Sequence, residues 1–244
     1  MKDILSCAYT APDGSGWKLE RIGNAALLTK LSGGGRRVFR RTPRKVLSVD
    51  IILNLKMFFR DLAPEWNGLP ISEEGVRGSI ELSFSDEKFL LPHGAMPPEE
   101  QKNVVADLLR YFEAVFGGTY KECSCPFRSF EGGGPEYTAV SDGRGVFTWS
   151  AQKEYIKKGG GDSDGAAYNM HFTFWPLRPG EGSCVITGTS PIAPKTECRV
   201  IVKVNGSLAA ECFAGAETEV GGPEEEPESG AFEDIEEPAA GDGE

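Results

Sequence analysis

Glycine and proline interrupt this chain so often that it must turn many times along its length. The 244 residues include 31 glycines and 16 prolines, with glycine triplets at residues 33–35, 132–134 and 159–161. Glycine supplies the backbone conformations that tight turns need, and proline removes a hydrogen-bond donor from helices and strands. We therefore expect a strand-rich architecture with many turns rather than a helical bundle.

Two segments have the apolar periodicity of an amphipathic helix. In residues 49–62, with Ser48 as the N-cap, the apolar stripe consists of Ile51, Ile52, Leu55, Phe58, Phe59 and Leu62. The second helix begins at Pro97 and Pro98, where proline loses no helical hydrogen bond, and ends at Gly117. Its buried face consists of Val104, Val105, Leu108, Leu109, Phe112, Val115 and Phe116.

The rest of the body has the alternation of short β-strands. The expected strands cover residues 7–10, 17–22, 24–31, 36–41, 78–84, 146–150, 168–175, 183–187 and 199–204. Strands and helices do not alternate regularly, so the pattern predicts an α+β fold with a mostly antiparallel, β-rich core and about two amphipathic helices. We assign residues 1–214 to one globular domain and residues 215–244 to a disordered acidic tail.

The charges are strongly segregated along the chain. The formal net charge is −11, but residues 211–244 carry thirteen acidic residues and no lysine or arginine, which leaves residues 1–210 at +2. A segment of this composition buries too little apolar surface to offset its chain entropy, so we expect it to be disordered. Phe232 and Ile235 form a small apolar island among the acids, and we expect them to bind a protein partner.

A basic segment follows the first glycine triplet. Six of the ten residues from 36 to 45 are basic, and the acid nearest to them is Asp50. Arginine and lysine neutralise phosphates, and an aromatic ring can stack on an unpaired base. We therefore predict a nucleic-acid interface, with a second, weaker cluster near residues 153–158. The predicted contacts are Arg36, Arg37, Phe39, Arg40, Arg41, Arg44, Lys45, Lys153, Tyr155, Lys157 and Lys158.

A β-rich body with a basic segment and an acidic tail resembles the layout of single-stranded DNA-binding proteins of bacteria and bacteriophages. The tail lacks the terminal phenylalanine beside acidic residues that those proteins often have. The resemblance implies an accessory protein that binds single-stranded DNA, with a tail that recruits partners or competes for the basic surface. The alternatives are a structural or assembly protein, viral or cellular, whose basic arm contacts a protein partner, and an enzyme that uses carboxylates. Self-association is compatible with each of them.

Catalytic and cofactor motifs are missing or out of context. The Gly-x-Ser-x-Gly match at residues 161–165 follows a polar glycine triplet instead of a strand, and Thr173 occupies the position where a calcium loop needs glutamate. The two histidines, His93 and His171, fall in a turn and on the polar side of a strand. We therefore expect no enzymatic activity and no cofactor.

The cysteines and the start of the chain bear on where the protein acts. The six cysteines lie at positions 7, 123, 125, 184, 198 and 212, and only one pair has a short metal-site spacing. We expect reduced thiols and no structural zinc. The first residues lack the pattern of a secretory signal, and no apolar stretch is long enough to span a membrane. These features predict a cytoplasmic protein that does not bind membranes.

Overall fold

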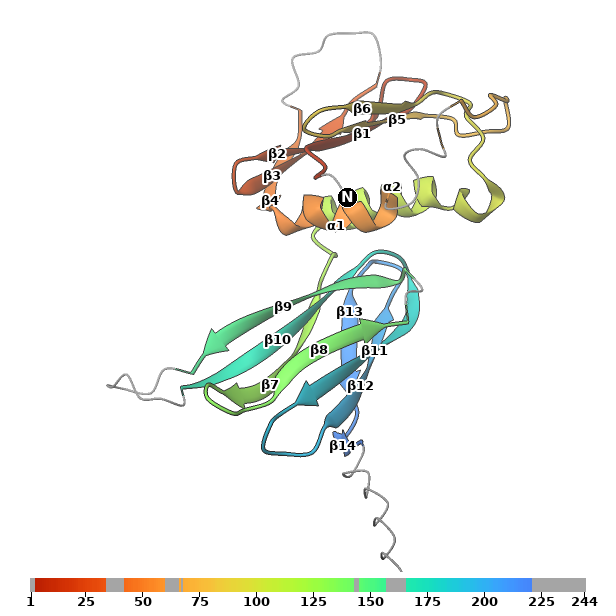
Figure 1. Cartoon of the computed structure of the whole chain (residues 1–244). Helices are drawn as coiled ribbons and strands as arrows, with labels where there is room; N and C mark the ends of the chain where they lie inside the picture. Colours follow the sequence, from red (N-terminus) through yellow and green to blue (C-terminus); the bar gives the residue numbers. More distant parts are fainter. Residues whose placement is uncertain are drawn as a thin grey trace, which may run out of the picture.

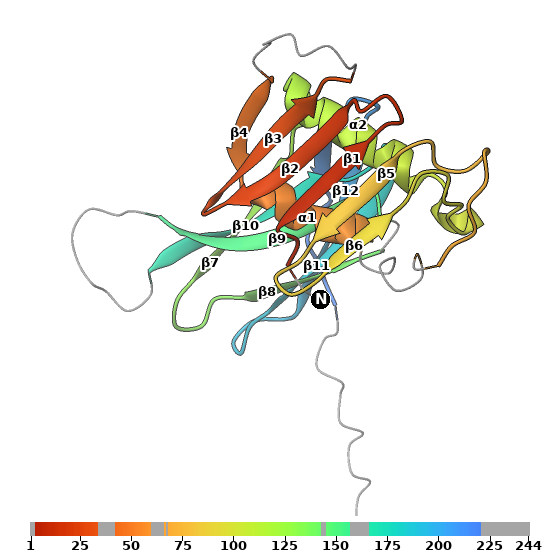
Figure 2. The same ribbon diagram turned by 90° about the horizontal axis from the view of Figure 1, so that it is seen from above.

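The computed structural model describes residues 3–33, 42–59, 66, 68–142, 145–156 and 166–220 of the chain. Its first half is a six-stranded antiparallel sheet with strand order β4-β3-β2-β1-β5-β6. The strands are β1 (Ser6–Thr10), β2 (Gly16–Ile22), β3 (Ala25–Leu31), β4 (Arg44–Ser48), β5 (Ser79–Ser83) and β6 (Lys88–Leu91). Two helices, α1 (Asp50–Phe59) and α2 (Val104–Gly117), lie on one face of this sheet (Figures 1 and 2).

Apolar side chains alternate along these strands, which gives the sheet one buried face. Leu19, Leu28 and Ile80 are fully buried on the face that the helices cover. From the helices, Leu55 and Phe112 are buried to the same extent. The opposite face of the sheet carries no helix and points away from the rest of the molecule (Figure 1).

The second half is a β-sandwich of antiparallel strands. One sheet has the order β7-β10-β9 and the other β13-β12-β11-β8, with β14 paired to β12. The strands are β7 (Cys123–Phe130), β8 (Glu136–Ser141), β9 (Phe147–Tyr155), β10 (Ala167–Pro176), β11 (Gly180–Thr189), β12 (Thr196–Val204), β13 (Ala210–Ala214) and β14 (Thr218–Glu219). Their inward side chains fill a common core, as expected for sheets packed face to face.

The two halves adjoin through the helices. Figure 1 shows α1 and α2 between the six-stranded sheet and the sandwich. Buried side chains from both halves form one hydrophobic cluster. Asp107 in α2 is buried, and its carboxylate lies 3.7 Å from the Nε atom of Arg178, which follows β10. Residues 1–214, which we assign to a single domain, include both halves.

The structure confirms the α+β class with two helices and antiparallel sheets. The start of the second helix was predicted too early. Pro97 and Pro98 precede a 3₁₀ turn at Glu99–Gln101, and α2 begins only at Val104. The predicted end is confirmed, because Gly118 has a φ of 80°, a left-handed conformation that favours glycine.

The tail begins later than the sequence predicts. We placed the boundary at residue 215, but Thr218–Glu219 forms β14 and pairs with β12. Two backbone hydrogen bonds extend this edge, from Gly215 to Arg199 at 2.9 Å and from Val220 to Lys195 at 2.8 Å. Residues 221–244, including Phe232 and Ile235, lie outside the described part of the chain.

No helix among the described residues is both long and apolar enough to cross a membrane.

Candidate functional site

The basic segment connects the last two strands at one edge of the six-stranded sheet. β3 ends at Leu31 and its antiparallel partner β4 begins at Arg44, so residues 32–43 form the connection of an edge hairpin. Arg36, Arg37, Phe39, Arg40 and Arg41 lie outside the described residues. The positions of the two strand ends nevertheless fix where this connection leaves the fold.

Arg44 is the described arginine of the predicted interface. It is exposed, and it is the cross-strand partner of Thr29, which is in turn the partner of Lys18. Side chains alternate along a strand, and Lys45 points to the helices, so Arg44 belongs to the uncovered face. No acidic side chain in the described part of the chain forms an ion pair with Arg44.

Lys45 points to the other face and stabilises the fold. Its Nζ atom donates to the carbonyl oxygens of Val115 at 2.8 Å and Phe116 at 3.3 Å, in the last turn of α2. Carbonyls at a helix C-terminus have no intrahelical partner and carry partial negative charge, which a lysine compensates. The ammonium group of Lys45 is therefore engaged within the protein.

Replacement of Lys45 by methionine is expected to lower the free energy of unfolding by about 1–2 kcal/mol, because two hydrogen bonds to a charged group are lost. The matched control is Arg44→Met at the next residue, which should change stability by less than about 0.5 kcal/mol. Urea unfolding of both variants measures the difference. Equal stability of the two variants would show that Lys45 does not cap the helix.

The second predicted cluster is an internally paired network. Glu131 accepts hydrogen bonds from the hydroxyl of Tyr155 at 2.8 Å and from the Nζ atom of Lys153 at 3.3 Å. The same Nζ atom lies 4.4 Å from the centre of the Tyr168 ring. The hydrogen bond from Tyr155, followed by that from Lys153, holds the pKa of Glu131 below its usual value. The Glu131 carboxylate and the Tyr168 ring thus partly neutralise the positive charge of Lys153.

Replacing Tyr155 by phenylalanine should raise the pKa of Glu131 toward its ordinary value, because the lost hydrogen bond stabilises the carboxylate. Carbon-13 NMR titration of the glutamate carboxyl groups measures this shift. An unchanged pKa in the variant would mean that the hydroxyl does not hold the carboxylate in solution.

The two predicted clusters belong to different halves of the molecule. Arg44 and Lys45 are on β4 of the six-stranded sheet, whereas Lys153 and Tyr155 are on β9 of the sandwich (Figure 1). Lys157 and Lys158 lie outside the described residues.

The sequence offers few histidines for catalysis or metal binding, namely His93 and His171. His171 Nε2 lies 2.9 Å from a carboxylate oxygen of Glu154 on the neighbouring strand, on the polar side that the sequence predicts. No cluster of three or more His, Cys, Asp or Glu side chains among the described residues is arranged to hold a metal ion. The Gly-x-Ser-x-Gly segment at 161–165 falls outside these residues.

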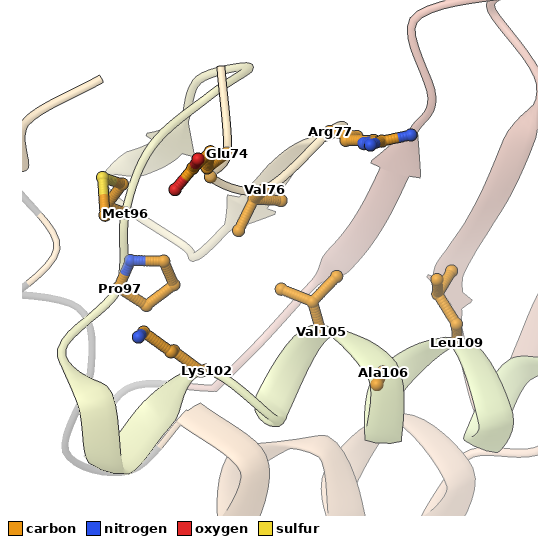
Figure 3. A pocket seen from close by; sticks show the side chains of 10 residues that line it. Glu74, Val76, Arg77, Met96, Pro97, Lys102, Val105, Ala106 and Leu109 are labelled. Atoms are coloured by element: carbon orange, nitrogen blue, oxygen red, sulfur yellow. The ribbon is translucent and has the colours of Figure 1, made fainter. Parts of the chain in front are cut away.

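Sequence reasoning missed a pocket beside the first turns of α2. Its volume is about 420 Å³, within the ~300–1,000 Å³ range typical of ligand pockets. Figure 3 shows one wall made by the helix and the other by the segments around Val76 and Met96. The lining residues are Glu74, Gly75, Val76, Arg77, Met96, Pro97, Lys102, Val105, Ala106 and Leu109.

Backbone hydrogen bonds hold the wall opposite the helix in place. The Val76 amide donates to the Ala95 carbonyl at 2.9 Å, and the Gly94 amide donates to the Val76 carbonyl at 2.6 Å. At Gly75 the two segments approach so closely that a Cβ atom would lie 2.5 Å from the Gly94 carbonyl oxygen. The pocket is therefore preformed, and it requires glycine at position 75.

The chemistry of the pocket suits an apolar group. Val76, Val105 and Leu109 supply apolar walls, while Arg77 and Lys102 place cations at the rim. Lys102 is paired with Glu99, and Glu74 adds a second acid nearby. Val105 and Leu109 belong to the face of α2 that the sequence pattern predicts to be continuously buried. The structure leaves both only partly buried, and they line this pocket.

A scan against protein-family models, a search of curated proteins and a search of solved structures each found no match to this chain.

Proposed function

We propose that this protein is a non-catalytic accessory protein of the cytoplasm that binds single-stranded DNA through the basic β3–β4 connection. The observation that carries the proposal is the position of Arg44. It is exposed at the start of edge strand β4, without an ion-pair partner in the described part of the chain, and lies three residues after Arg41, the last of the arginine-rich residues 36–41.

The sequence of the connection suits a flexible DNA backbone. It carries Arg36, Arg37, Arg40 and Arg41 between two paired strands, with Phe39 among them. Guanidinium groups bind phosphates through charge-assisted hydrogen bonds, and a phenylalanine ring stacks on any base without sequence preference. Arg44 continues this charge onto the uncovered face of the sheet.

The second cluster, around Lys153 and Tyr155, is not part of the proposed DNA-binding site. Lys153 and Tyr155 are both held by Glu131, so their contribution to DNA binding would require that network to open. We therefore place the binding residues on the β3–β4 connection and expect Lys153→Ala to leave affinity within about twofold of the parent protein.

The acidic tail has two roles in the proposal. Its carboxylates compete with DNA phosphates for the arginines, and Phe232 with Ile235 binds a protein partner. Both roles depend on the composition of residues 221–244, which hold ten acids and no base.

Fluorescence anisotropy with a labelled oligothymidine tests the proposal. Binding at ~50 mM salt should weaken steeply as salt increases, because each neutralised phosphate releases counterions. The same oligonucleotide in duplex form serves as the comparison, and weaker binding to the duplex is expected because its bases cannot stack on Phe39. Absence of binding at ~50 mM salt by both the full chain and a chain truncated after Val220 would rule the function out.

The preformed pocket beside α2 favours a second candidate, a structural or assembly protein. An apolar side chain of a partner, or of another copy of this chain, fits its volume. Ala106→Trp would place an indole in the cavity from an exposed helix position. Light scattering then discriminates the candidates, because concentration-dependent self-association that A106W abolishes, without DNA binding, supports assembly.

A further inference from the structure

Five of the six cysteines gather in the sandwich. Cys123 and Cys125 are on β7, and the others are Cys184 on β11, Cys198 on β12 and Cys212 on β13. All are free thiols in this structure. Neither the fold nor the proposed function uses their chemistry, and no group of three is arranged to hold a metal within the described residues.

Two of these thiols meet where β7 and β13 adjoin. The strands belong to different sheets, but residues just before them, Lys121 and Ala209, form a parallel bridge. The Lys121 amide donates to the Leu208 carbonyl at 3.1 Å, and the Ala210 amide donates to the Lys121 carbonyl at 2.8 Å. Cys123 lies two residues after Lys121, and Cys212 lies three residues after Ala209. Because the two segments run in the same direction from the bridge, these two cysteines lie close to each other.

Exposure singles out this pair. The Cys212 thiol lies close to those of both Cys123 and Cys125. Cys123 and Cys212 are partly exposed, whereas Cys125, Cys184 and Cys198 are buried. A small oxidant therefore has access to the pair but not to the three buried thiols.

We propose that Cys123 and Cys212 form a reversible disulfide that joins β7 to β13. The oxidant is a small disulfide such as oxidised glutathione. One protein thiol loses its proton and attacks a sulfur of that disulfide, which gives a mixed disulfide and expels one glutathione thiolate. The other protein thiolate then attacks the mixed disulfide and expels the second. Two protein thiols are oxidised, one small disulfide is reduced, and both protons end on the released thiols.

The environment of the pair sets the pH dependence. Burial and then the neighbouring Cys212 raise the pKa of Cys123 well above its usual value. Thiolate is the reacting form, so oxidation should be slow near neutral pH and accelerate as the pH rises. A disulfide should also stabilise the sandwich, because it restricts the unfolded chain.

Thiol counting after treatment of the full chain with oxidised glutathione at mildly alkaline pH tests the proposal. Alkylation under denaturing conditions should show a fall from six free thiols to four, reversed by dithiothreitol. A non-reducing gel should show monomer only, and the oxidised form should unfold at a higher temperature. Six thiols remaining after prolonged oxidation would overturn the proposal.

Three variants assign the bond, because Cys123 and Cys125 are too close in sequence for tryptic peptides to separate them. Cys125→Ser should still lose two thiols on oxidation, as should the control Cys7→Ser in the other half. Cys123→Ser should lose none. Retention of all thiols by C125S, with loss of two by C123S, would place the bond at Cys125 and contradict the pairing.

Discussion

Replacement of Arg36, Arg37, Arg40 and Arg41 by alanine is expected to weaken binding to single-stranded DNA by at least about 100-fold at ~50 mM salt. These side chains would supply most of the phosphate contacts in the proposed interface. The slope of log affinity against log salt should fall by about 3, because each lost contact with a single strand removes ~0.7 from it. Anisotropy titrations at several salt concentrations measure both quantities.

The matched control removes the same charge elsewhere. Arg21, Lys88, Lys195 and Lys203 lie outside the basic connection and pair at the surface with Asp3, Glu81, Glu197 and Glu181, respectively. Their replacement by alanine costs little stability, because exposed ion pairs contribute about 0–1 kcal/mol. Equal losses of affinity in the two quadruple variants would show that binding follows net charge and not the proposed site.

Truncation after Val220 is expected to tighten DNA binding by about tenfold at ~50 mM salt, with a smaller effect at high salt. It removes ten acids and changes the formal net charge from −11 to −1. The cut is placed there because Thr218–Glu219 pairs with β12, so a cut at residue 215 would also remove part of the fold. The same anisotropy assay gives the comparison.

A full-length variant with the acids of residues 221–244 changed to glutamine or asparagine separates charge from chain length. It should bind DNA as tightly as the truncated protein if carboxylates compete for the arginines. Unchanged affinity in both variants would mean that the tail does not occupy the basic surface. In that case only its predicted role in partner binding would remain.

Much of the fold follows from local pattern. β2, β3, β5 and β10 are predicted within a residue or so, because their apolar side chains alternate between a buried and an uncovered face. The end of α2 follows from glycine chemistry at Gly118. Its start does not, because Pro97 and Pro98 are equally compatible with the 3₁₀ turn that precedes the helix.

Other elements depend on contacts that the sequence does not display. β4 was not predicted, since Arg44–Ser48 does not alternate between polar and apolar residues and forms a strand by pairing with β3. β7 was not predicted either, because Pro126 interrupts its pattern. That proline is accommodated at an edge position of the three-stranded sheet.

The candidate site shows the same limit. The basic composition of residues 36–45 identifies a charged segment, but it does not distinguish exposed Arg44 from Lys45, whose Nζ atom caps α2 some 70 residues away. Likewise, Glu131 holds Lys153 and Tyr155 across a separation of more than 20 residues. Composition indicates which charges are available, and only tertiary contacts decide which of them are occupied.

Photo-crosslinking of the full chain to an oligonucleotide containing 4-thiothymidine, followed by mass-spectrometric mapping, tests most directly whether the β3–β4 connection binds DNA. We expect the crosslinked residues to fall within residues 36–45, with Phe39 among them. Crosslinks confined to β9 near Lys153 and Tyr155, or to the pocket beside α2, would contradict the proposed interface.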